Sequence, residues 1–145
     1  MKVLLDTSIL YPALTRGHPQ HLACRSLISR LEGEAQIFIL NTHLIAELYS
    51  NLTRIPSLKI PARTAQTVIQ NLVARFDYID LNMTDYLAAV ERCASREIVS
   101  GAIFDALHLQ AAIKAEVNFL YTVNRRDFDR LYEGELGVKI ASIDS

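Results

Sequence analysis

Short apolar runs alternate with longer amphipathic segments along the whole chain, and this alternation is what most constrains the fold. The runs predicted as strands are residues 3–5, 37–40, 76–81, 119–123 and 138–140. Strands that alternate with helices favour parallel pairing, with helices covering both faces of the sheet. We therefore expect an α/β fold, a three-layer sandwich whose mostly parallel central sheet has about five strands flanked by helices.

Apolar residues recur at helical spacing between the predicted strands. The predicted helices are residues 7–15, 19–33, 42–52, 61–74, 84–97, 103–115 and 127–133, with a proline-containing loop over 54–61. Thr42 is expected to cap the third helix, and Pro61 is expected to open the fourth. We find no repeat, linker or low-complexity tract, so residues 1–145 are interpreted as a single domain.

The composition indicates one globular domain and excludes a strongly basic protein. The chain has 145 residues, of which half are hydrophobic and 21% are charged, which is typical of one globular domain. The net charge is −1, so binding to nucleic acid would need a local basic patch or metal ions that offset the protein's own acids.

The two cysteines and the apolar runs indicate where such a chain resides. Cys24 and Cys93 are too few for a disulfide scaffold, and we expect buried free thiols in a reducing, cytoplasmic setting. Asp6 interrupts the first apolar run before it reaches the length of a signal peptide core. No run approaches the roughly 20 residues that span a bilayer, so we expect no membrane association.

Several acidic and polar side chains follow the predicted strands, where ligands bind in parallel sheets. If strands one, two and four are neighbours, these side chains converge. Asp6 ends the first strand, Glu47 lies just over one turn into the helix after the second, and Asp105 lies near the start of the helix before the fourth. The polar residues that follow strands two and four are Asn41, Thr42, His43, Asn124, Asp127 and Asp129.

Several carboxylates in one cleft repel one another, and a divalent cation relieves that repulsion. Oxygen ligands select Mg²⁺ or Mn²⁺ over zinc, and such ions activate water and bind substrate phosphates. The expected chemistry is phosphodiester hydrolysis. Each acid has a structural alternative: Asp6 as a helix cap, Glu47 as an exposed helical acid, and Asp105, Asp127 and Asp129 as acids that favour a helix N-terminus.

Four segments, in order along the chain, resemble the motifs of PIN-domain ribonucleases, especially the VapC-like toxins of toxin–antitoxin pairs. The first is Leu-Leu-Asp-Thr-Ser-Ile-Leu at 4–10, and the second is His-Leu-Ile-Ala-Glu-Leu at 43–48. The third is Ile-Phe-Asp-Ala-Leu-His-Leu-Gln-Ala-Ala at 103–112, and the fourth is Leu-Tyr-Thr-Val-Asn-Arg-Arg-Asp-Phe at 120–128. Together they span nearly the whole chain.

The resemblance implies an endoribonuclease that depends on Mg²⁺ or Mn²⁺, with Asp6 and Asp105 as the core metal ligands and Glu47 as the second acid. It favours Asp127 as the fourth acid, with Asp129 and Asn124 as rivals for that position. Thr7 and Thr122 match polar positions that orient carboxylates or water, although hydroxyls after strands also cap helices.

The resemblance also implies an RNA substrate, a homodimer and a cognate antitoxin, and a groove on the helix pair 42–74 is the expected docking site for that antitoxin. The best candidates for backbone contacts to RNA are Arg125, Arg126 and Arg130. The second choices are Arg16, Arg54, Lys59 and Arg63, each with a solvated surface role as the alternative. Tyr11 and Tyr49 are interpreted either as base-stacking residues or as core residues.

Two other functions remain open at this point. One is a non-catalytic PIN-like module that binds RNA or protein, although all four acidic positions are occupied here. The other is a phosphatase with a nucleophilic aspartate after the first strand. That class needs a second aspartate two residues later, where this chain has Ser8.

Overall fold

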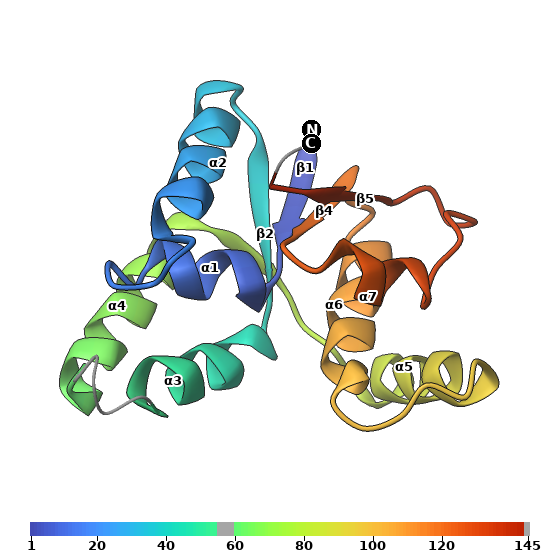
Figure 1. Cartoon of the computed structure of the whole chain (residues 1–145). Coiled ribbons are helices and arrows are strands. Elements are labelled where there is room, and N and C mark those ends of the chain that lie inside the picture. The colour runs from blue at the N-terminus through green and yellow to red at the C-terminus, as the bar shows by residue number, and fades with distance from the viewer. Residues whose placement is uncertain (55–59, 144–145) are drawn as a thin grey trace.

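The computed structural model describes residues 1–54 and 60–143, which form five strands and seven helices. The strands are β1 (Lys2–Leu5), β2 (Ile37–Asn41), β3 (Asp77–Ile79), β4 (Phe119–Thr122) and β5 (Lys139–Ser142). The helices are α1 (Thr7–Ala13), α2 (His21–Gly33), α3 (Leu44–Arg54), α4 (Ala62–Arg75), α5 (Met83–Ser95), α6 (Ala102–Lys114) and α7 (Arg125–Asp129). Figure 1 shows their arrangement.

The strands form one sheet in the order β3-β2-β1-β4-β5, and every neighbouring pair is parallel. The predicted α/β sandwich is confirmed. β1 lies at the centre, with Leu4 opposite Ile39 of β2 on one side and Leu120 of β4 on the other. Strands one, two and four are therefore neighbours, which is the condition on which convergence of the acids depended.

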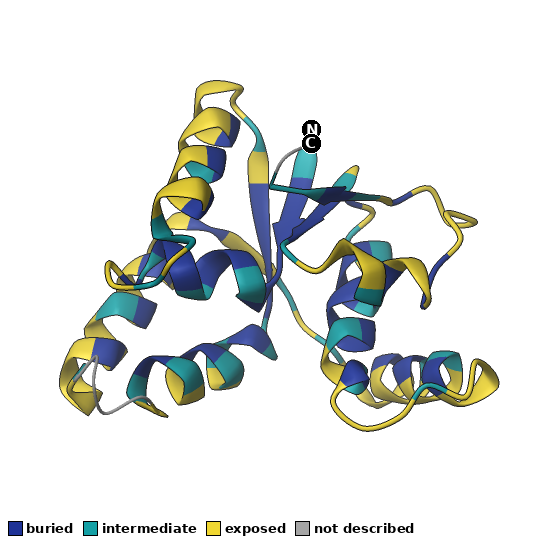
Figure 2. Cartoon of the chain, in the orientation of Figure 1, coloured by how far each residue is buried: buried dark blue, intermediate teal, exposed yellow. Residues whose placement is uncertain are grey.

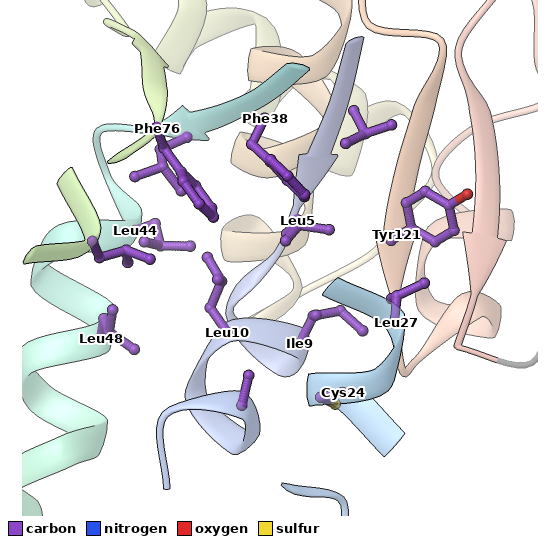
Figure 3. Close-up of a cluster of buried hydrophobic side chains, with 14 of the residues drawn as sticks. Leu5, Ile9, Leu10, Cys24, Leu27, Phe38, Leu44, Leu48, Phe76 and Tyr121 are labelled. Atoms are coloured by element: carbon purple, nitrogen blue, oxygen red, sulfur yellow. The ribbon is translucent and has the colours of Figure 1, made fainter. Parts of the chain in front are cut away.

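Alternate residues of β1 pack into two separate cores. Val3 and Leu5 face the core beneath α1, α2, α3 and α4, where Ile9, Leu10, Leu44 and Leu48 are fully buried (Figure 3). Leu4 faces the second core, which packs against α5, α6 and α7 around Phe128. Figure 2 shows that the central strands and the inner helix faces are buried and the outer helix faces are exposed. Because both faces of β1 are covered, its sequence is continuously apolar rather than alternating.

Several predicted helix boundaries differ from the observed ones, most of all at α7, and a side-chain hydrogen bond at the end of β2 explains the later start of α3. α3 begins at Leu44, two residues after Thr42, because the Asn41 side chain accepts a hydrogen bond from the His43 N–H at 3.0 Å and holds an intervening turn. α7 covers residues 125–129 rather than 127–133. Most of the predicted loop over 54–61, including Lys59, lies outside the described residues, and Arg54 is the last residue of α3.

Cys24 and Cys93 are both buried and unbonded to each other, which confirms the prediction of free thiols. Burial, and then the charge of Asp6, raises the pKa of Cys24 to about 11, so its thiol is inert at neutral pH. None of the helices within residues 1–54 and 60–143 is both long and apolar enough to cross a membrane.

Candidate active site

Asp6 lies at the carboxyl end of the central strand, at the junction with α1. Its N–H donates to the Tyr121 carbonyl at 3.2 Å, which places Asp6 directly beside the end of β4. Asp6 occupies the N-cap position of α1, but its carboxylate makes no capping hydrogen bond. The Ser8 hydroxyl donates to Asp6 Oδ1 at 2.6 Å instead. Asp6 thus stands at the position of a helix cap, while the Ser8 hydroxyl orients its carboxylate at the carboxyl end of the central strand.

Burial destabilises the ionised form of the Asp6 carboxylate. Asp6 is 3% exposed, and its burial raises the pKa. The charge of His108 and the hydroxyls of Ser8 and Thr122 lower the pKa but do not offset the burial. In the protein without a bound cation, ionised Asp6 is therefore destabilised.

Glu47 enters the site from α3 and is held by three side chains. The Thr7 hydroxyl donates to Glu47 Oε2 at 2.9 Å, and the other oxygen, Oε1, lies 3.4 Å from His108 Nε2 and 3.6 Å from His43 Nε2. Burial raises the pKa of Glu47, but the contacts with His108, Thr7 and His43 outweigh it and hold the pKa below its usual range. Glu47 is thus ionised at neutral pH and is partly buried, which contradicts the interpretation as a simple exposed acid.

His108 is the buried centre of this network. It lies on α6, is 1% exposed, and its Nε2 lies 3.2 Å from Thr7 Oγ1. Its Nδ1 lies 3.4 Å from the Asn41 amide nitrogen, whose orientation is fixed because Asn41 Oδ1 accepts from the His43 N–H. Burial lowers the pKa of His108, but Glu47, Asp6 and Asp105 raise it by more. Because the Asn41 amide nitrogen is a donor that faces Nδ1, the neutral ring carries its proton on Nε2, as the protonated ring also does. Nε2 is therefore a donor toward Thr7 and Glu47.

Asp105 lies in the first turn of α6 and is half-buried. Burial and the charge of Asp6 raise its pKa to about 6, with smaller contributions from Asp127 and Glu47 and an opposing one from His108. Acids on α3, on α7 and at the end of β1 therefore lie close enough to Asp105 to raise its pKa. This supports the prediction that Asp6, Glu47, Asp105 and Asp127 lie near one another.

The two rivals for the fourth position differ in their surroundings. Asp127 is 45% exposed and contributes to the raised pKa of Asp105. Asp129 is 55% exposed, points into an ion pair with Arg125 at 3.6 Å, and is not among the groups that shift Asp105. Asn124 is exposed, and its side chain caps no helix. This geometry favours Asp127 over Asp129.

Thr7 and Thr122 are both buried, and each orients a neighbour. Thr7 orients Glu47, as described above. Thr122 Oγ1 accepts from the Asn124 N–H at 3.0 Å and lies 3.2 Å from the Ser8 hydroxyl, which also accepts from the Val123 N–H at 2.9 Å. These hydroxyls connect the end of β4 to the carboxylate of Asp6.

The arginines predicted to contact RNA lie on α7 and at its C-terminal end, and all three are exposed. Arg125 pairs with Asp129, and Arg130 lies 3.9 Å from Asp127. Arg126 forms no ion pair within the described part of the chain, so its guanidinium is the most available of the three. Ion pairs between such exposed groups are weak and do not prevent phosphate binding.

The donor set fits a hard divalent cation. Asp6 and Asp105 are partly desolvated carboxylates with raised pKa values, and a cation between them would relieve both penalties. Glu47 Oε1 is buried, and its contacts with His108 Nε2 and His43 Nε2 are long, at 3.4 and 3.6 Å, so this oxygen still has room to accept a further partner. No three His, Cys, Asp or Glu side chains in these ranges form a ready-made metal cage. Mg²⁺ does not need one, because it is held by one or two carboxylates together with waters and substrate phosphate.

The sequence placed Ser8, Asn41 and His43 at strand ends, where polar side chains were expected to converge, but it did not predict their contacts. It gave no role to His108. His108 lies three residues after Asp105, on the otherwise apolar face of α6 that carries Leu109 and Ala112. A lone histidine on a buried face is usually structural, so its role emerged only from its contacts with α1 and α3.

Comparison with known proteins agrees with this fold. Residues 3–134 match the model of the PIN domain family. The chain is 33% identical over 109 residues to Ribonuclease VapC27 of Mycobacterium tuberculosis, covering 74% of each chain. Its structure is similar to VapBC-1 from nontypeable Haemophilus influenzae, with a TM-score of 0.71, 15% identity and 100% coverage of both chains. It is also similar to the sarcin-ricin loop cleaving toxin VapC20 of Mycobacterium tuberculosis, with a TM-score of 0.66, 15% identity and 92% coverage of both. The chain belongs to the PIN domain family.

Proposed function

We propose that this protein is an endoribonuclease that depends on Mg²⁺ or Mn²⁺ and is the toxin of a toxin–antitoxin pair. The observation that carries the proposal is a pair of carboxylates near the carboxyl end of the central strand: Asp6 is buried, and Asp105 is half-buried and lies close enough to Asp6 for that charge to raise its pKa. The proposal is supported by the sequence similarity to a ribonuclease over 74% of the chain.

Asp6 and Asp105 would hold the ion, with Glu47 and Asp127 acting directly or through water. When bound there, a divalent cation supplies charge neutralisation for a substrate phosphate and lowers the pKa of a coordinated water. Ser8 and Thr122 fix the orientation of Asp6, while His108 and Thr7 fix that of Glu47. Arg126, Arg125 and Arg130 would bind the RNA backbone beside Asp127.

In the proposed reaction, the oxygen of water forms a bond to phosphorus and the bond to the ribose 3′ oxygen breaks. The carboxylates around the water accept its proton, and the leaving oxygen takes up a proton from solvent. The products carry a 5′-phosphate and a 3′-hydroxyl. Analysis of product ends tests this, because attack by the ribose 2′-hydroxyl would give a 2′,3′-cyclic phosphate instead.

The assay incubates the purified protein with total RNA and defined oligonucleotides in Mg²⁺, in Mn²⁺ and in EDTA. We expect cleavage with either ion and none in EDTA. A protein that binds RNA without cutting it under any of these conditions would be the non-catalytic alternative.

A groove between α3 and α4 supports the proposed antitoxin partner. It has a volume of about 690 Å³ and is lined by apolar side chains that include Ile45, Tyr49 and Ile69, with Arg63 at its edge. It falls within the helix pair 42–74 that the sequence indicated. Co-purification with the product of an adjacent small gene, weakened by Tyr49→Asp, would support this partner. Size-exclusion chromatography with light scattering tests the proposed homodimer.

A further inference from the structure

A second hollow opens directly beside the carboxylate centre. It has a volume of about 310 Å³ and lies between α1, the loop before α2, one face of α3 and the segment after β4. Thr7 and Ser8, which hydrogen-bond to Glu47 and Asp6, form the wall that it shares with the acids. Asn51 lies one helical turn beyond Glu47 on the same face of α3 and lines the hollow further from the acids.

Neutral polar groups without partners line this hollow. The side-chain amides of Gln20, Asn51 and Asn124 come from three different segments, and none forms a hydrogen bond within residues 1–54 and 60–143. His18 Nδ1 accepts from the Gln20 N–H at 3.0 Å, so the proton of the neutral ring is on Nε2. That Nε2–H is also without a partner in the described part of the chain.

Two aromatic rings complete the wall. The Tyr11 and His18 rings meet edge to face with their centroids 5.5 Å apart. The Tyr11 hydroxyl is buried, and no group among the described residues hydrogen-bonds to it. A flat ligand with both donors and acceptors would therefore find aromatic contact and unpaired amides in the same place.

The charge of the hollow excludes a second phosphate as its occupant. Within the described ranges, no lysine or arginine lines the hollow. The acid Glu47 does line it, and Asp6 is hydrogen-bonded to the lining residue Ser8. Side-chain amides pair with the edges of nucleobases, and aromatic rings stack on their faces. We propose that this hollow binds one nucleobase of the RNA, adjacent to the scissile phosphate, and that Asn51 and Gln20 select its identity. This inference rests on the proposed ribonuclease function.

The test is the cleavage of a randomised RNA pool, followed by sequencing of the cut ends. The wild-type protein should prefer one or two bases at a single position next to the cut. Asn51→Ala and Gln20→Ala should each reduce that preference about fivefold or more, which is the discrimination expected of one lost amide–base contact. The matched control is Asn71→Ala, an exposed amide on α4 that lines neither this hollow nor the α3–α4 groove, and it should leave the preference unchanged. An unaltered preference in both test variants would overturn the inference.

A second measurement separates this inference from the proposed function. If the wild-type protein cuts no RNA, the function fails, and the hollow is tested alone by titrating the four uncharged ribonucleosides while recording backbone amide NMR spectra. Shifts confined to residues such as Tyr11, Gln20 and Asn51, and weakened in Asn51→Ala, would support a base site. Shifts caused equally by inorganic phosphate, or no shift with any nucleoside at millimolar concentration, would contradict it.

Discussion

His108 Nε2 lies 3.4 Å from Glu47 Oε1, so a buried imidazole on α6 is joined to a carboxylate on α3 across the candidate active site. The same nitrogen lies 3.2 Å from the Thr7 hydroxyl on α1. One side chain therefore connects the three helices that surround the end of β1. Because burying Glu47 without these contacts would be costly, His108 determines where its carboxylate lies.

Substitution of His108 should separate its hydrogen-bonding role from its volume. In His108→Leu the ring volume is partly kept but Glu47 loses its buried donor, and we expect unfolding free energy to fall by about 3 kcal/mol and cleavage to fall at least tenfold. His108→Gln can present an N–H near the position of Nε2 and should retain most activity. Urea unfolding and cleavage rates measure both effects. Equal losses in the two variants would mean that His108 only fills space.

Asp6→Asn and Asp105→Asn should each lower the cleavage rate about 100-fold or more, while the circular dichroism spectrum is unchanged. Both variants should also be more stable than the wild type in EDTA at neutral pH, because each removes a partly desolvated charge. Asp129→Asn is the matched control, since Asp129 is exposed and paired with Arg125. Loss of activity in Asp129→Asn with full activity in Asp127→Asn would reverse our assignment of the fourth acid.

The stability of the metal-free protein should depend on pH through Asp105. Its pKa is raised to about 6 in the folded state, so the folded protein binds a proton more tightly than the unfolded chain. Protonation of Asp105 stabilises the folded protein fully below the ordinary aspartate pKa. This stabilisation is lost as pH rises from about 4 to about 6. Thermal unfolding in EDTA measures it, and the decline over this range should be smaller in Asp105→Asn. A wild-type curve identical to that of Asp105→Asn would contradict the raised pKa.

Asp85 should show the opposite dependence. Burial raises the pKa of Asp85, but Lys114 at 2.7 Å, the Asn82 N–H of the capping box and Gln110 lower it by more. Its contribution to stability is therefore present above the ordinary aspartate pKa and is lost as pH falls through the lowered folded-state value. We expect Asp85→Asn to cost about 2 kcal/mol at pH 7 and much less near pH 3. Thr84→Asn on the exposed side of the same turn is the control and should be nearly neutral at both pH values.

The sequence predicted the fold well because the apolar strands and amphipathic helices are local patterns. It also placed Asp6 at the end of the first strand, as observed. Glu47 lies nearer to the start of its helix than predicted and Asp127 lies further into its helix, both within the first turn. It could not predict that Asn41 delays the start of α3, because that depends on a side-chain hydrogen bond to the His43 N–H. Nor could it assign His108, whose partners Thr7 and Glu47 are 101 and 61 positions away in the sequence and meet it only in the folded protein.

The most direct test of the central claim is single-turnover cleavage of one defined RNA, measured against Mg²⁺ or Mn²⁺ concentration for the wild type and for Asp6→Asn. We predict no cleavage by the wild type in EDTA, saturable recovery when the ion is added, and no recovery in Asp6→Asn at any concentration. Undiminished wild-type cleavage in EDTA, or a full response to the ion in Asp6→Asn, would contradict a metal centre built on Asp6.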